Sequence, residues 1–202
     1  MAREYTSTVR AERAEATRRR LVTTATEMFC ARGWSATTMA DVATAAGIAR
    51  QTVYQQFAGK LDLLDACIDL ALTAGQGGAV RALDDYRAMG HGTLDARITA
   101  GSSWLRGAHE RSARIQNVLD QAAVTDAEAA ARLRVREQNR WEEVRHAVSL
   151  ILSSTPDDEL VDALWVLASR RTYLMLVDGR GWTSARWQEW FAVQTGHAIT
   201  DD

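Results

Sequence analysis

The chain has 202 residues, 47% of them hydrophobic, and a formal net charge of −2. This length and composition suit a globular protein with a full core. No run approaches the ~20 apolar residues of a membrane-spanning helix, and the N-terminus lacks the apolar stretch of a secretory signal. We therefore expect a cytoplasmic protein. Cys30 and Cys67 are too few for a disulfide framework, and we expect both to be small buried hydrophobes.

The composition predicts an all-α protein of about nine helices. Pro156 is the only proline in the chain, and apolar runs of period two, rich in Val, Ile and Thr, are missing. Alanine and arginine, which both favour helices, are abundant.

The N-terminal third predicts an arm followed by short helices. Residues 1–15 are polar without an apolar period, so we expect a flexible arm. Apolar residues at steps of one, three and four predict a helix over about 16–32, which Gly33 ends. Thr38 and Asp41 form a capping-box-like helix start. Further short helices are expected over about 39–45 and 50–57, with a fourth from about residue 59.

The remainder predicts longer helices, separated by glycine-rich breaks and by Pro156. They are expected over about 94–108, 112–122, 126–152, 158–177 and 184–199. The helix over 158–177 has two apolar faces, so it needs a second surface to bury. Paired with the tryptophan-bearing last helix, it would form half of a four-helix bundle across a two-fold axis. We therefore expect a homodimer through these two helices.

The charged residues are distributed unevenly along the chain. Residues 1–60 carry nine basic and five acidic side chains, a net charge of +4, whereas residues 61–202 carry 15 and 21, a net charge of −6. A positive head on a negative body is the asymmetry expected when one end of a protein faces phosphate. A solvated N-terminal tail would produce the same excess, so charge alone does not decide between them.

The segment from Thr37 to Phe57 has helix-turn-helix spacing. Counted from Met39, a small Ala43 stands at place five, Gly47 at place nine and Val53 at place fifteen. The small residue lets two helices cross closely, the glycine takes a left-handed backbone angle, and the branched residue packs between the helices.

From about Arg18 to Leu64 the chain resembles the tetracycline-repressor (TetR) family of regulators. The residues that carry the resemblance are Leu21, Ala25, Phe29, Gly33, Trp34, Thr37, Thr38, Asp41, Val42, Ala43, Ala46, Gly47, Ile48, Thr52, Val53, Tyr54, Phe57, Lys60, Leu63 and Leu64. The chain departs from the family at Ala49, where a polar capping residue is usual, and at Gly59 and Leu61. The resemblance implies a three-helix DNA-binding domain over 1–57 and a ligand-binding and dimerisation domain over 58–202.

The resemblance also implies that helix 50–57 enters the major groove of DNA. Arg50, Gln51 and Gln55 would then face base edges, where Arg suits guanine and Gln suits adenine. Phosphate contacts are expected from Thr38, Thr52, Tyr54, Gln56 and Lys60. The N-terminal arginines Arg10, Arg13, Arg18, Arg19 and Arg20 are candidates for additional contacts, although a solvated helix face is an equal interpretation of the last three.

For the larger domain we expect an unidentified small-molecule effector and no cofactor. Trp104 and Trp141 are candidates for lining its pocket, with Gln116 and His146 as polar candidates. The histidines have neither an i, i+4 partner nor a CxxC companion, so no metal site is expected. Catalytic and phosphate-binding motifs are missing as well, and no enzymatic activity is expected.

These features together favour a ligand-responsive transcriptional regulator, usually a repressor in this family, which binds palindromic operator DNA as a dimer. Two alternatives stay open. One is a helical small-molecule-binding or catalytic protein that has lost operator binding. The other is a protein-interaction module that uses the same motif for packing.

Overall fold

The computed structural model describes residues 2–200, with side chains described from residue 11 onward, and every regular element in this range is helical. The chain divides into two compact units, one through Leu70 and one from Ala71 onward. The expectation of an all-α fold with about nine helices is confirmed. The division falls 13 residues later than the boundary expected after residue 57, because the fourth helix packs mostly with the first unit.

The N-terminal unit contains four helices: α1 (Ala2–Arg32), α2 (Met39–Ala46), α3 (Arg50–Gln56) and most of α4 (Lys60–Leu72). Their apolar faces share one core, formed by fully buried side chains from each helix. These include Leu21, Ala25, Phe29, Val42, Val53, Leu63, Leu64 and Ile68. The apolar period that predicted the helix ending at Gly33 therefore corresponds to a buried face of α1.

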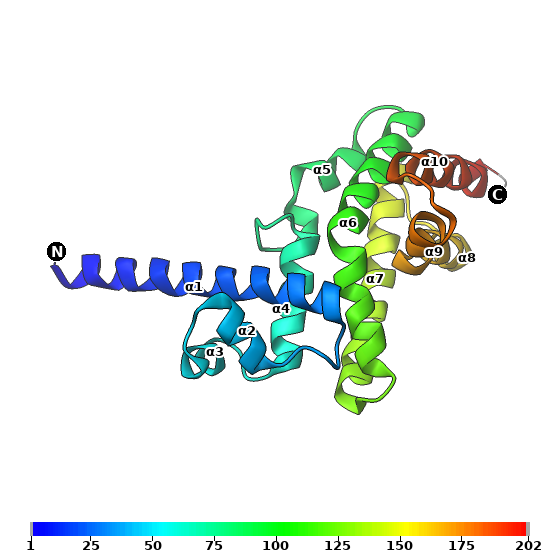
Figure 1. Cartoon of the computed structure of the whole chain (residues 1–202). Coiled ribbons are helices and arrows are strands. Elements are labelled where there is room, and N and C mark those ends of the chain that lie inside the picture. The colour runs from blue at the N-terminus through cyan, green and yellow to red at the C-terminus, as the bar shows by residue number, and fades with distance from the viewer. Residues whose placement is uncertain (1, 201–202) are drawn as a thin grey trace. The chain divides into compact units, whose positions relative to one another are not determined.

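The expectation of an irregular arm over residues 1–15 is wrong, because α1 is helical from Ala2. Its first half extends past α2 and α3 (Figure 1), and residues 11–16 are exposed. The sequence from Ala2 to Arg32 contains neither glycine nor proline, and alanine, glutamate and arginine have high helix propensity. An ion pair between Glu15 and Arg19, 3.7 Å apart at i, i+4, adds to this local preference.

The C-terminal unit comprises η1 (Val80–Ala82), α5 (Asp84–Arg87), η2 (Ala88–Gly90), α6 (Leu94–Ala123), α7 (Ala127–Leu152), α8 (Asp158–Leu167), α9 (Arg170–Arg180) and α10 (Ser184–Thr200). The two longest helices, α6 and α7, pack against each other, and α10 lies against α6. A three-residue connection between α6 and α7 makes them antiparallel neighbours (Figure 1). Asp157 caps α8 by accepting from the Leu160 N–H at 2.8 Å.

Two helix boundaries in this unit differ from expectation. The predicted helices 94–108 and 112–122 form the single helix α6, because His109 faces the interior and does not interrupt the apolar face. The predicted helix 158–177 is broken between α8 and α9. Ser169 caps the second part by accepting from the Thr172 N–H at 3.1 Å.

The two cysteines have different surroundings. Cys67 is buried as expected, and burial raises the pKa of its thiol to about 12. Cys30 is exposed, so that expectation is wrong. It follows the buried Phe29 in α1, and the 100° turn per residue carries it away from the apolar face.

Within the described range, no helix combines the length and apolar character needed to cross a membrane.

Candidate nucleic-acid interface

The turn between α2 and α3 has the backbone geometry that the motif spacing predicted. Gly47 ends α2 with φ +63°, in the left-handed region that favours glycine. The next amide, that of Ile48, donates to the Ala43 carbonyl at 2.9 Å. Ala43 and Val53 are both buried, as a close crossing and an inter-helix contact require. The left-handed turn at Gly47, the hydrogen bond from Ile48 to Ala43 and the burial of small and branched side chains between α2 and α3 together fix the angle between the two helices.

The start of α2 is a complete capping box. The Thr38 hydroxyl accepts from the Asp41 N–H at 3.1 Å and donates to Asp41 Oδ2 at 2.7 Å. The Thr38 amide donates to the same carboxylate oxygen at 3.1 Å. These hydrogen bonds lower the pKa of Asp41. Thr38 itself is exposed, directly before the first residue of α2.

Helix α3 directs most of its polar side chains away from the core. Val53 is the only one of its seven residues that is buried, and Tyr54 is 52% exposed. Arg50, Gln51 and Gln55 are exposed as well, whereas Thr52 and Gln56 are partly buried. A short amphipathic helix with long polar groups on its outer side has the chemistry needed to reach base edges and phosphates. The neighbouring Phe57 belongs to the core, with 3% exposure.

The ends of α3 differ in how they are stabilised. Ala49 precedes the helix and provides no side-chain hydrogen bond, as expected from its replacement of a polar residue. At the other end, Arg18 Nη1 donates to the Gln56 carbonyl oxygen at 3.0 Å.

Lys60 begins α4, and its ammonium group is engaged within the unit. Nζ lies 3.9 Å from the centre of the Trp34 ring and donates to the Trp34 carbonyl oxygen. Partial burial lowers the pKa of Lys60. Of the side chains expected to contact DNA, Lys60 is thus already engaged within its own unit.

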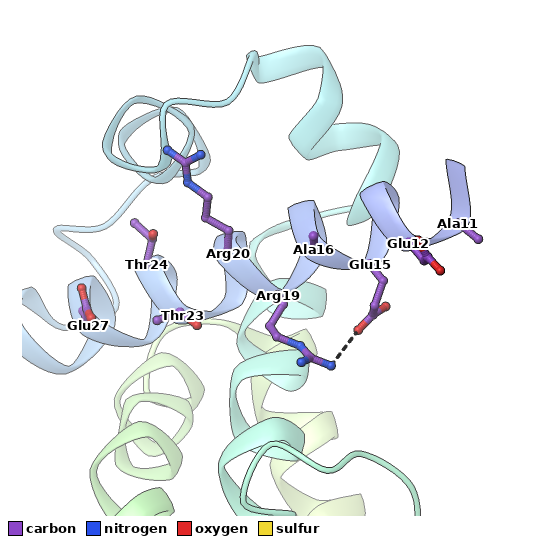
Figure 2. A pocket seen from close by; sticks show the side chains of 9 residues that line it. All are labelled: Ala11, Glu12, Glu15, Ala16, Arg19, Arg20, Thr23, Thr24 and Glu27. Atoms are coloured by element: carbon purple, nitrogen blue, oxygen red, sulfur yellow. Dashed lines mark ion pairs between the residues drawn. The ribbon is translucent and has the colours of Figure 1, made fainter. Parts of the chain in front are cut away.

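The three consecutive arginines of α1 point in different directions. Arg18 lies against the end of α3, and Arg19 pairs with Glu15 while its side chain stays 61% exposed. Figure 2 shows Arg19 and Arg20 extending from opposite sides of α1. A Cβ placed on Gly47 would lie 3.1 Å from Arg20 Nη2, so this guanidinium group covers the turn. Arg13 is exposed; the side chain of Arg10 lies outside the described part of the chain.

An open hollow of about 780 Å³ lies beside α1 (Figure 2). Its lining comes entirely from that helix, and most of the lining residues are of polar or charged types: Ala11, Glu12, Glu15, Ala16, Arg19, Arg20, Thr23, Thr24 and Glu27. A surface formed by one helix does not enclose a small molecule, so this hollow does not have the form of an effector site.

In the C-terminal unit, two of the four candidate ligand residues meet at Tyr86. The Tyr86 ring packs edge-on against Trp104, with ring centres 5.0 Å apart, and its hydroxyl lies 3.2 Å from His146 Nδ1. Trp141 instead donates from Nε1 to Asp162 at 2.7 Å. Gln116 donates to the Ser112 hydroxyl at 2.8 Å.

Sequence reasoning missed Tyr86 and the environment of His109. Tyr86 lies in a four-residue helix, too short to show a period, and is 1% exposed. The His109 ring lies between Tyr173 and Trp187, at centre-to-centre distances of 5.0 and 5.2 Å. Burial lowers the pKa of His109 to about 3, so this imidazole is neutral in the folded protein. No group of side chains in the described residues has the composition of a metal site.

The left-handed turn, the buried contact between α2 and α3, and the polar outer side of α3 define a helix-turn-helix DNA-binding domain. Residues 21–67 match the family model described as "Bacterial regulatory proteins, tetR family". The N-terminal domain of this chain is therefore similar to the DNA-binding domain of that family.

Two curated relatives agree with this assignment. The chain is 38% identical over 72 residues to the HTH-type transcriptional regulator AlkX of Mycobacterium tuberculosis, covering 36% of this chain and 29% of the relative. It is 43% identical over 58 residues to the HTH-type transcriptional regulator SrpR of Pseudomonas putida, covering 29% and 27%. The matched region thus spans less than a third of the length of each relative.

Proposed function

We propose that this protein is a transcriptional regulator, acting as a repressor, that binds palindromic operator DNA as a homodimer and is released by a small molecule. The observation that carries the proposal is the outer side of α3, where Arg50, Gln51, Tyr54 and Gln55 are exposed around the single buried residue Val53. A helix used only for packing has no need for long polar side chains at these positions. The names of the two relatives support the same function.

Roles in DNA binding follow from side-chain chemistry. Arg50 is proposed to donate to a guanine edge, and Gln51 and Gln55 to pair with adenine edges in the major groove. The phosphate contacts proposed for Thr38, Thr52, Tyr54, Gln56 and Lys60 would fix position along the duplex without reading sequence. To reach phosphate, the Lys60 ammonium group would have to leave its position over the Trp34 ring and its bond to the Trp34 carbonyl oxygen.

The proposed dimer surface lies on the last helices of the chain. Exposed apolar side chains are present on α8, α9 and α10: Val166 is 56% exposed, Met175 69% and Val193 53%. A second copy is the natural partner, because a two-fold dimer presents two recognition helices about 34–36 Å apart, one turn of DNA. Because the predicted helix over 158–177 is divided into α8 and α9, the proposed surface comprises three helices.

The proposed effector binds the C-terminal unit. Trp104 Nε1 is buried, and no hydrogen-bond acceptor for it is found among the described residues. A buried donor left unpaired costs stability, so a ligand that supplies an acceptor would be favoured here. The effector would shift operator affinity by binding better to one spacing of the two recognition helices.

The test is DNA binding by the full chain, measured by anisotropy on fragments selected from a random duplex library. Wild type is expected to enrich a palindrome and to bind it in a salt-sensitive way. Substituting Arg50→Ala and Tyr54→Ala together should remove the preference for the palindrome while the melting temperature stays within a few degrees. Arg134→Ala, an exposed arginine of α7 outside the proposed dimer and DNA surfaces, serves as the control and should bind like wild type.

Failure to enrich any sequence, or equal binding by the Arg50/Tyr54 variant, would refute the proposal. Turnover of a small molecule without any sequence-selective DNA binding would favour the alternative of a helical protein that has lost operator binding.

A further inference from the structure

Arg18 of α1 reaches across the N-terminal unit to the end of α3. Its guanidinium carbon lies 4.3 Å from the centre of the Phe57 ring, and Nη1 donates to the Gln56 carbonyl oxygen at 3.0 Å. Gln56 is the last residue of α3, and Phe57 continues the chain in an extended conformation while its ring is buried. One side chain therefore contacts both the last residue of the recognition helix and the residue that anchors it in the core.

Helix α3 has few other interactions that would hold it in place. It has seven residues, one buried side chain and no side-chain cap at its start. A helix this short is marginal by itself, and its last carbonyl oxygens have no partner inside the helix. The last turn contains no basic residue of its own, although a positive charge at the C-terminal end of a helix is stabilising. Arg18 supplies that charge from another helix.

The neighbouring Arg19 of α1 is a solvent-exposed arginine with which Arg18 can be compared. Its side chain is 61% exposed and its ion-pair partner is Glu15 on the same helix. Arg18 is half-buried and contacts residues 38 and 39 positions away. The two arginines have the same charge and adjacent positions but different surroundings, which makes Arg19 a matched control.

We propose that Arg18 is a positioning residue: it fixes the orientation of α3 against α1 and so determines how selectively α3 reads DNA, without itself contacting phosphate. This inference rests on the proposed operator binding. Its physical basis is that a bond to a carbonyl and a ring contact at one end of α3 restrict the tilt of the helix. The side chains that would meet base edges depend on that tilt for their bidentate geometry.

The DNA-binding test compares Arg18→Met, Arg18→Lys and Arg19→Met on the selected palindrome and on an unrelated duplex, at several salt concentrations. Arg18→Met is expected to lose about tenfold in affinity for the palindrome, the scale of one hydrogen bond to a charged group. Affinity for the unrelated duplex should stay within about twofold, and the salt slope should be unchanged. Arg18→Lys, which retains a cation and a donor, should recover part of the loss.

A phosphate contact would give a different result. Arg18→Met would then weaken binding to both duplexes alike and reduce the salt slope by about 0.9 for each protomer bound, the value for one phosphate contact. That outcome would overturn the proposal, as would equal effects of Arg18→Met and Arg19→Met on the ratio of the two affinities.

A second measurement needs no DNA and separates this inference from the proposed function. Amide hydrogen exchange over residues 50–57 should be about tenfold faster in Arg18→Met than in wild type, and unchanged in Arg19→Met. Unchanged exchange in Arg18→Met overturns the proposal. If wild type selects no sequence, the proposed function fails and the specificity claim fails with it, while the exchange result still decides whether Arg18 holds α3. Should Arg18→Met not fold, the same comparison is made with Arg18→Lys, for which a smaller increase is expected.

Discussion

Replacing Arg170 by methionine tests how the break between α8 and α9 is held. The Arg170 side chain is 5% exposed and contacts two carboxylates from different helices. Its Nε and Nη2 donate to the two oxygens of Asp120 on α6 at 3.0 and 2.8 Å, and Nη1 donates to Glu137 on α7 at 2.5 Å. The first residue of α9 is thereby tied to both long helices of the C-terminal unit.

The expected loss of stability follows from this geometry. Removing one partner of a buried ion pair costs about 3–5 kcal/mol, because the remaining charge is left without compensation. Here Asp120 still has Arg171 at 2.8 Å and Glu137 still has Arg140 at 2.8 Å. We therefore expect the low end, about 3 kcal/mol, which corresponds to a fall in Tm of roughly 10 °C for a unit of this size.

The assay is urea unfolding followed by tryptophan fluorescence. Six of the seven tryptophans lie in the C-terminal unit, so the signal reports mainly on that unit. The matched control is Arg171→Met. Arg171 contacts the same Asp120 but is 66% exposed, and its loss should cost less than about 0.5 kcal/mol. A change below about 1 kcal/mol for Arg170→Met, or equal changes for the two variants, would refute the reasoning.

Three further predictions concern pH and local geometry. The pKa of His109 is about 3 when folded and near 6.5 when unfolded, so below pH 6.5 the unfolded state binds the extra proton. Stability should therefore fall by about 2 kcal/mol from pH 7 to pH 5 in urea titrations, and much less in His109→Gln. Thr38→Ala should cost about 1 kcal/mol in thermal unfolding. The hydrogen bonds from Thr38 lower the pKa of Asp41 in the folded protein. The capping box therefore adds to the free energy of unfolding above the unfolded-state pKa of that carboxyl, and this contribution is lost as the pH falls from there through the folded-state pKa. Gly47→Ala should cost about 1–2 kcal/mol, because φ is +63°, whereas Gly59→Ala is the control in which the added methyl group meets no atom within 4 Å and the backbone is not left-handed.

Each of these three predictions has a contradicting result. Equal pH dependence in wild type and His109→Gln would mean that this histidine is not held neutral by burial. A Thr38→Ala variant as stable as wild type at pH 7 would argue against a working capping box. Equal Tm values for Gly47→Ala and Gly59→Ala would show that the left-handed angle is not required.

The sequence predicted best those features that are fixed by local chemistry. The capping box at Thr38, the left-handed Gly47 and the buried Val53 are determined by residues within one motif, and all three were confirmed. The missing cap at Ala49 was also predicted correctly, since a methyl group cannot accept a hydrogen bond. Which of the eight candidate residues contact DNA stays a prediction.

Features that depend on distant residues could not be predicted. The helix break at residues 168–169 is stabilised by side chains from two other helices. Arg140 of α7 donates to the Trp165 carbonyl at 2.8 Å, and the Ala168 carbonyl lies 3.1 Å from His109 Nε2 of α6. The spacing of apolar residues over 158–177 carries no information about these contacts from other helices. The continuity of α6 likewise depends on packing, because His109, which lies between the two predicted helices, is buried in the interior.

The position of Lys60 has a practical consequence for binding experiments. It is the only lysine in the sequence, so amine-directed reagents modify one side chain besides the α-amino group. That side chain begins α4, packed against Trp34 within the helix-turn-helix domain. Its lowered pKa increases the share of neutral, reactive amine at any given pH. Amine coupling to a sensor surface would therefore attach the protein through the domain proposed to face DNA, so the duplex should be the immobilised partner.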